Sequence, residues 1–302
     1  MLDLLTRAGA FIGVILLGML LRKVGLFRED DFRVLSNIVI KITLPAAIVT
    51  SFSQNEIQTD MLILALLGFG GGVIYMICGY LLHIRRSKQW RAFGVLNLPG
   101  YNIGAFALPF TQSFLGPVGV VATCLFDTGN AFICLGGSYS VATMIQDGSG
   151  FSIKRLLKSM GKSVPFLCYL IVVPLNLLRI RLPGPVLQFA GIISNANAFM
   201  AMLAIGVGFK LSGDRSQIGD IVKMLLVRYA VAAVLATMFY HLLPFSLEVR
   251  QTLVILCFAS IGAAVPPFTR ELGGDVGLSS AINSIAIVCS IVIMVTLLGV
   301  ML

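Results

Sequence analysis

Three charged side chains lie inside long apolar stretches of the sequence: Lys41, Asp127 and Arg228. An ionisable group in the middle of a membrane-length apolar helix costs roughly 2.5–3.5 kcal/mol on insertion, and such groups usually mark ion pathways, proton relays or ligand sites. Asp127 is the most informative of the three, because its short side chain cannot extend to a membrane surface from that depth. The surroundings of this carboxylate are therefore the first place to look for chemistry.

Asp127 is followed three residues later by Asn130, so both polar side chains lie on one face of a helix. Two interpretations are open at this stage. The pair is either a site for a coupling cation or proton, or a set of internal ion pairs and hydrogen bonds that only holds the bundle together. We predict a coupling-ion or proton site at Asp127 and Asn130.

Long side chains can bury their apolar stems and extend their charge to the membrane surface. This snorkelling explains Arg228 best. Lys41 is more evenly balanced between snorkelling and binding, because it shares its helix with Asn37, Thr43 and Pro45.

The composition sets the class of protein. Of 302 residues, 58% are hydrophobic and 12% charged, about half the usual charged share, and the mean hydropathy is +0.97. Soluble enzymes, disordered chains and nucleic-acid binders are excluded, and the lipid bilayer is the expected partner. Ten apolar segments are candidate spans: residues 4–21, 34–52, 61–82, 92–115, 118–143, 163–178, 186–209, 221–243, 251–268 and 278–302.

The basic residues predict the orientation of these spans. The formal net charge is +9, and 16 of the 22 Lys and Arg residues fall in loops that follow odd-numbered spans. By the positive-inside rule those loops are cytoplasmic, so both termini face outward and the chain is a multi-pass protein of the cytoplasmic membrane. A signal peptide in the first span is the weaker alternative, because Asp3 precedes it and no small-residue cleavage site is evident.

An internal repeat predicts the architecture. Residues 103–119 align without gaps to residues 261–277, and 9 of the 17 positions are identical. The two segments belong to spans four and nine, so the repeat unit has five helices, and an odd number makes the second copy inverted. We therefore expect an all-α polytopic membrane protein with two inverted five-helix repeats, residues 1–144 and 163–302, joined by a cytoplasmic loop, residues 145–162.

Both repeated segments are rich in helix breakers. Proline removes a backbone donor and clashes with the preceding turn, so spans four and nine should be broken helices. A single proline kink usually serves packing, but corresponding breaks in two inverted halves point to a substrate site at the repeat interface. The breakers are Pro99, Gly100, Gly104 and Pro109 in span four, and Gly262, Pro266 and Pro267 in span nine.

Asn102 is the strongest ligand candidate, because its amide lies next to the break in span four and can both donate and accept hydrogen bonds. The predicted substrate-binding residues are Tyr101, Asn102, Gly104, Pro109, Lys41, Ser260, Pro266 and Pro267. No catalytic constellation or metal-binding motif is found, and the six cysteines show no paired spacing, so neither an enzyme nor a metal site is expected. No cofactor is expected beyond a coupling proton or Na⁺.

The chain resembles the auxin efflux carrier family, within the bile acid/auxin carrier superfamily, and is most similar to its bacterial-type permeases. The resemblance covers essentially the whole length. It rests on the residues at 21–26, Leu44-Pro45-Ala46, Tyr101-Asn102-Ile103-Gly104 through Leu108-Pro109, Phe126-Asp127 with Asn130, and Gly274-Asp275.

This resemblance implies ten helices in two inverted repeats, with spans four and nine crossing as broken helices. It also implies a homodimer in which a transport domain moves against a scaffold in an elevator-like way. Related proteins carry organic anions, including auxin in plants and malate or malonate in bacteria. Asn102 and Pro109 match the family's crossover, and Pro267 matches its second-repeat counterpart.

One residue departs from the family pattern. Lys41 stands where relatives commonly carry an uncharged polar residue, which suggests either a more acidic substrate or a pairing with Asp127. The expected function is secondary transport of a small organic anion, a mono- or dicarboxylate. A sensor or channel on the same fold, binding an organic anion without carrier-type flux, is the alternative.

Overall fold

A computed structural model describes residues 2–28, 30–209 and 215–301, and every regular element in these ranges is helical. Lys210, one of the 16 basic residues that the sequence assigns to cytoplasmic loops, lies outside these ranges. The first half contains α1 (Leu2–Lys23), α2 (Asp31–Ile38), η1 (Val39–Thr43), α3 (Leu44–Gln54), η2 (Thr59–Leu62), α4 (Ile63–Leu82), α5 (Lys88–Asn97), η3 (Ile103–Ala107), α6 (Leu108–Phe114), α7 (Pro117–Phe132), η4 (Ile133–Gly137) and α8 (Ser138–Asp147). The second half contains α9 (Ile153–Met160), α10 (Val164–Leu177), α11 (Gly184–Asn195), α12 (Asn197–Gly208), η5 (Arg215–Gln217), α13 (Ile218–Leu242), α14 (Leu247–Cys257), α15 (Val265–Glu271) and α16 (Val276–Met301).

Six continuous helical stretches among the described residues are long and apolar enough to cross a membrane. The number becomes seven if α9 and α10, which meet at 78°, form one span. The expected spans four and nine each consist of two short pieces, so neither supplies a helix of membrane length. The fold is therefore all-helical with multiple spans, and the total of ten remains a prediction.

The two predicted breaks are present. α5 ends at Asn97 and helical backbone resumes at Ile103, while α14 ends at Cys257 and α15 begins at Val265. The prediction of two broken helices is confirmed. Pro99, Gly100 and Gly262 lie in the breaks, whereas Gly104 and Pro109 lie in the helical backbone of η3 and α6, and Pro266 and Pro267 lie in the first turn of α15.

Two prolines also explain a local widening of the helices. η1 and η3 are π-helical segments, and each is followed directly by a Leu-Pro step, at Pro45 and Pro109. A proline ring clashes with the carbonyl four residues earlier and offers no N–H, so the preceding turn opens to wider spacing. These segments lie near each other, because a Cβ on Gly104 would be 2.4 Å from Leu44 Cδ2.

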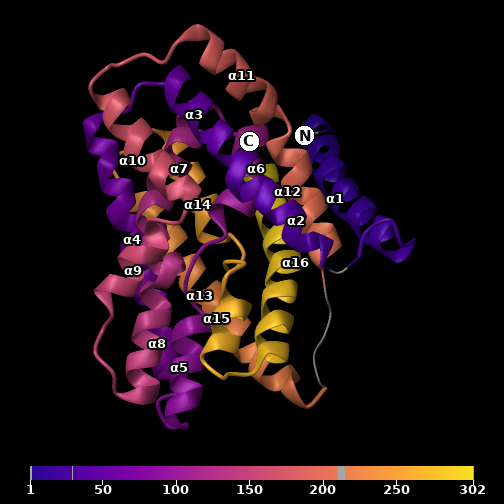
Figure 1. Cartoon of the computed structure of the whole chain (residues 1–302), viewed down its shortest axis with the longest axis vertical. Coiled ribbons are helices and arrows are strands. Elements are labelled where there is room, and N and C mark those ends of the chain that lie inside the picture. The colour runs from indigo at the N-terminus through magenta and orange to yellow at the C-terminus, as the bar shows by residue number, and fades with distance from the viewer. Residues whose placement is uncertain (1, 29, 210–214, 302) are drawn as a thin grey trace.

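The helices surround a buried centre near the two breaks. α5 and α8 lie at the lower end of the molecule and α11 at the upper end, while α16 runs through its middle beside α15 (Figure 1). α4 packs against both α5 and α7, and α13 packs against α14. The largest fully buried side chains include Arg228, Tyr75, Tyr101 and Phe126, so the centre contains a charge as well as aromatic rings.

Candidate functional site at the crossing of two broken helices

The chain segments at the two breaks lie against each other. The backbone N–H of Asn102 donates to the carbonyl of Ser260 across 2.8 Å, which joins the first break directly to the second. Gly100 has a φ of 83°, a left-handed conformation that favours glycine, and this turns the chain between α5 and η3. We call residues 98–102 and 258–264 together the crossing.

Arg228 of α13 holds the crossing from one side. Its guanidinium donates to the carbonyls of Leu98 at 2.5 Å, Gly100 at 3.0 Å and Ala259 at 2.8 Å. The side chain is 1% exposed, so the expectation that Arg228 snorkels to the membrane surface is wrong. The reason is that the broken helices supply carbonyl acceptors inside the protein, which makes an inward position favourable.

Asn130 of α7 holds the first break from another side. Its Oδ1 accepts from the backbone N–H of Tyr101 at 3.0 Å, and its Nδ2 donates to the carbonyl of Tyr101 at 2.8 Å. The side-chain amide of Asn130 thus bonds both backbone groups of Tyr101, as a residue on an adjacent β-strand would. Because Asn130 is 1% exposed, the Tyr101 N–H depends on it rather than on water, while the Tyr101 carbonyl also accepts from the Ile103 N–H at 2.9 Å.

Asp127 connects Asn130 to α10. Its Oδ1 accepts from Asn130 Nδ2 at 2.8 Å, and its Oδ2 accepts from the Tyr169 hydroxyl at 2.9 Å. Within the described residues no Lys or Arg forms an ion pair with this carboxylate. The pairing of Asp127 with Lys41 is therefore wrong. Lys41 is exposed on η1, while Asp127 is already engaged by two neutral donors.

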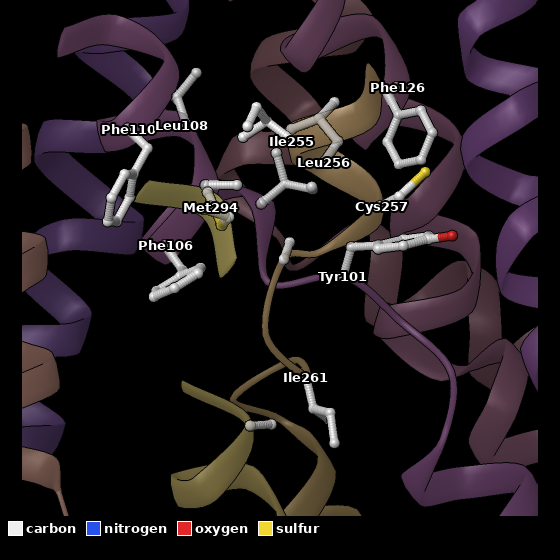
Figure 2. Close-up of a cluster of buried hydrophobic side chains, with 14 of the residues drawn as sticks. Tyr101, Phe106, Leu108, Phe110, Phe126, Ile255, Leu256, Cys257, Ile261 and Met294 are labelled. Atoms are coloured by element: carbon white, nitrogen blue, oxygen red, sulfur yellow. The ribbon is translucent and has the colours of Figure 1, made fainter. Parts of the chain in front are cut away.

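The other predicted site residues divide into two groups. Ser260 and Tyr101 lie in the crossing itself, and both are essentially fully buried. Figure 2 shows Tyr101 next to Cys257, the last residue of α14, with Phe126 nearby at a ring-centroid separation of 5.2 Å. The remaining residues flank the crossing: Gly104 in η3, Pro109 buried in α6, Pro266 half-buried and Pro267 exposed at the start of α15, and Lys41 exposed on η1.

Three buried polar atoms at the crossing have no hydrogen-bond partner among the described residues: the Tyr101 hydroxyl, Ser260 Oγ and Arg228 Nε. Most buried polar atoms in proteins are paired, so these three are exceptions. Sequence reasoning did not select Tyr169 or Tyr75 as neighbours of the site, because nothing local in the sequence distinguishes them from other buried tyrosines.

A polar cavity of about 410 Å³ lies beyond the crossing, between α3, α6, the start of α7 and α11. The side chains that line it within the described residues are uncharged, and most carry hydroxyl or amide groups: Thr50, Ser51, Gln54, Asn55, Gln112, Ser113, Ser194 and Asn195. Asn197 connects its wall to the rest of the bundle by donating to Gln112 Oε1 at 3.2 Å and accepting from Thr43 Oγ1 at 2.9 Å.

Apolar helices that are broken in pairs, with their exposed backbone buried at a common centre, are a recurrent feature of secondary transporters. Comparison with known proteins places the chain among membrane transport proteins. Residues 10–298 match the model of the membrane transport protein family. The chain belongs to this family, that of the auxin efflux carriers, so the resemblance seen in the sequence is confirmed.

Two archaeal relatives agree with the assignment. An uncharacterized transporter of Methanothermobacter thermautotrophicus is 24% identical over 240 residues, covering 77% of this chain and 76% of the relative. An uncharacterized transporter of Methanocaldococcus jannaschii is 26% identical over 208 residues, covering 64% of this chain and 65% of the relative. The chain is thus a multi-pass membrane protein of a transporter family.

Proposed function

We propose that the chain is a secondary transporter that moves a small organic anion, a mono- or dicarboxylate, across the cytoplasmic membrane. The observation that supports this most directly is the crossing, where Asn102 and Ser260 join two broken helices through their backbones. Irregular backbone is tolerated at membrane depth only where it is buried in protein or lines a wet cavity. A crossing of this kind provides polar groups for a solute without exposing them to lipid.

The anion is expected to bind beside Asn102. This residue precedes a continuous helical stretch formed by η3 and α6, and its side chain makes no hydrogen bond within the described part of the chain. The N-terminal end of a helix carries partial positive charge and free N–H groups, which favour a carboxylate. Lys41, on the neighbouring η1, adds a cation that an anionic substrate would approach.

The mechanism we propose is elevator-like alternating access between two inverted five-helix repeats. The order of elements supports the repeat, since the broken pair α5 and α6 precedes α7 as the broken pair α14 and α15 precedes α16. The polar cavity is consistent with such a movement, because residues of α3 and α11 line it opposite residues of α6 and α7. We also propose that the protein is a homodimer and that both termini lie outside the cell.

The test is uptake of labelled malate, malonate and lactate by proteoliposomes that contain wild type, Asn102→Ala or Pro109→Ala. Loss of a hydrogen bond to a charged group corresponds to an effect of about ten- to a hundredfold, which is the expected fall in uptake for Asn102→Ala. Pro109→Ala restores a backbone N–H and allows η3 to close into an α-helix, so a comparable fall is expected.

Asn37→Ala is the matched control, because Asn37 is an exposed asparagine of α2 away from the breaks. Undiminished uptake in both crossing variants would remove the crossing from the mechanism. Saturable binding of the anions without flux would identify a sensor instead, and single-channel conductance far above carrier turnover would identify a channel.

Asp127 is the proposed coupling residue. Asp127→Asn removes the titratable group while keeping a side chain that Asn130 and Tyr169 can still contact. We expect uptake by this variant to lose its dependence on an imposed proton or Na⁺ gradient, measured in proteoliposomes with and without each gradient. Wild-type uptake that is indifferent to both gradients would exclude the coupling role and leave the transporter assignment intact.

A further inference from the structure

We propose that Arg228 is the permanent cation of the crossing, and that its guanidinium occupies the position between two half-helix C-termini where a transporter of this architecture would otherwise hold an exchangeable metal cation. The crossing then binds no Na⁺. The inference concerns the site described above and rests on the proposed transport function only for its consequence, that any coupling ion must be bound elsewhere.

The ends of the two broken helices carry carbonyl groups that need partners. α5 ends at Asn97 and α14 at Cys257, and the last carbonyls of a helix have no partner within the helix and carry partial negative charge. Leu98 and Gly100 follow α5 directly, and Ala259 follows α14. Their three carbonyls converge on one guanidinium at 2.5, 3.0 and 2.8 Å. Arg228 therefore neutralises both broken ends together.

The charge of Arg228 has no carboxylate partner among the described residues. The Arg228 side chain is 1% exposed. Its Cζ lies 5.0 Å from the ring centroid of Tyr75 and 6.0 Å from that of Tyr101. Carbonyl dipoles and aromatic faces thus compensate the charge, as they would for a desolvated metal ion.

The surroundings of Arg228 resemble those of a bound metal ion. In transporters with broken helices, unwound carbonyls and half-helix C-termini are the groups that coordinate Na⁺. Here the corresponding carbonyls already accept from fixed donors, and the guanidinium keeps its charge at every physiological pH. A second cation at this position would meet repulsion from Arg228 and find these three ligands occupied.

The experiment measures the thermal unfolding of purified protein in sodium chloride, choline chloride and methylguanidinium chloride at equal ionic strength. Arg228→Met keeps the stem of the side chain but removes the charge and vacates the space of Cζ and the two Nη atoms, so its melting temperature should fall by about 5–10 °C. Methylguanidinium should recover part of that loss in a saturable way, and wild type should show no such gain. A cation-specific rescue is a response that a purely structural role for the side chain would not produce.

Arg250→Met is the matched control. Arg250 also donates to a carbonyl, that of Tyr240 at 3.0 Å, lies over an aromatic ring and has a buried Nε without a partner among the described residues, but it is remote from the breaks. The proposal is overturned if methylguanidinium raises the melting temperature of Arg228→Met no more than that of Arg250→Met.

If Arg228→Met does not fold, the comparison of Arg228→Lys with Arg228→Gln decides. Lysine keeps the charge with a different shape, whereas glutamine keeps an N–H donor without the charge. We expect the lysine variant to give more monodisperse protein and a higher melting temperature. Equal or better behaviour of the glutamine variant would contradict the proposal. None of these measurements needs a substrate, so a failure of the transport hypothesis would leave their outcome unaffected.

Discussion

Replacing Asn130 by alanine is expected to lower the melting temperature markedly and to reduce uptake by two orders of magnitude. The change leaves the buried N–H of Tyr101 without its acceptor at 3.0 Å and Asp127 Oδ1 without its donor at 2.8 Å, whereas the Tyr101 carbonyl still accepts from the Ile103 N–H at 2.9 Å. Each unpaired buried group costs about 1–3 kcal/mol, so we expect a loss of about 3 kcal/mol in the free energy of unfolding. Displacement of the chain by 1 Å near a binding site is enough for a roughly hundredfold loss of rate.

Thr128→Ala on the same turn of α7 is the control, because its hydroxyl donates only to the carbonyl of Cys124 within the helix. Its effect on unfolding should stay within about 0.5 kcal/mol. Asn130→Asp keeps the acceptor for the Tyr101 N–H but loses the donor to its carbonyl and places a second carboxylate beside Asp127. It should therefore be less stable than wild type. A wild-type melting temperature for Asn130→Ala would show that the Tyr101 backbone finds other partners.

The positions of the breaks could be predicted from the sequence because glycine and proline act locally. A proline removes its own N–H and disturbs the turn before it, so Pro99, next to Gly100, indicates a break without knowledge of any distant residue. The repeat at residues 261–277 located the second break in the same way. The partners of the breaks could not be predicted, since the contact between Asn102 and Ser260 joins positions that lie far apart in the chain.

Arg228 shows most clearly what could not be predicted from the sequence. From the sequence it is one arginine some turns into an apolar helix, and snorkelling is the least expensive position for an isolated helix. The three carbonyls that bind it come from the ends of α5 and α14, which only the tertiary structure brings together. Asp127 shows the same effect, because its partner Tyr169 comes from α10 and not from the helix that carries Lys41.

Replacing Gly68 of α4 by alanine is expected to lower the free energy of unfolding by about 3 kcal/mol or more. A Cβ at this position would be 2.1 Å from the carbonyl oxygen of Phe126, and a Cβ on Gly129 would be 1.7 Å from the carbonyl oxygen of Ala65. Small residues let two membrane helices approach at backbone distance, and here they set the contact between α4 and α7. Accommodating a methyl group must push α7 away, and with it the turn from Asp127 to Asn130 that holds the crossing.

Gly70→Ala is the matched control, since a Cβ there has nothing within 4 Å although the residue lies on the same helix. Both changes add one methyl group and the same gain in helix propensity, so their difference isolates the contact with α7. Overpacking of this kind usually costs about 1–3 kcal/mol, and a clash with backbone rather than a flexible side chain places Gly68→Ala at or above the upper end. Gel filtration and thermal unfolding of the two purified variants measure the difference. Equal behaviour of the two would mean that α4 and α7 can separate without loss, and that the crossing does not depend on their close approach.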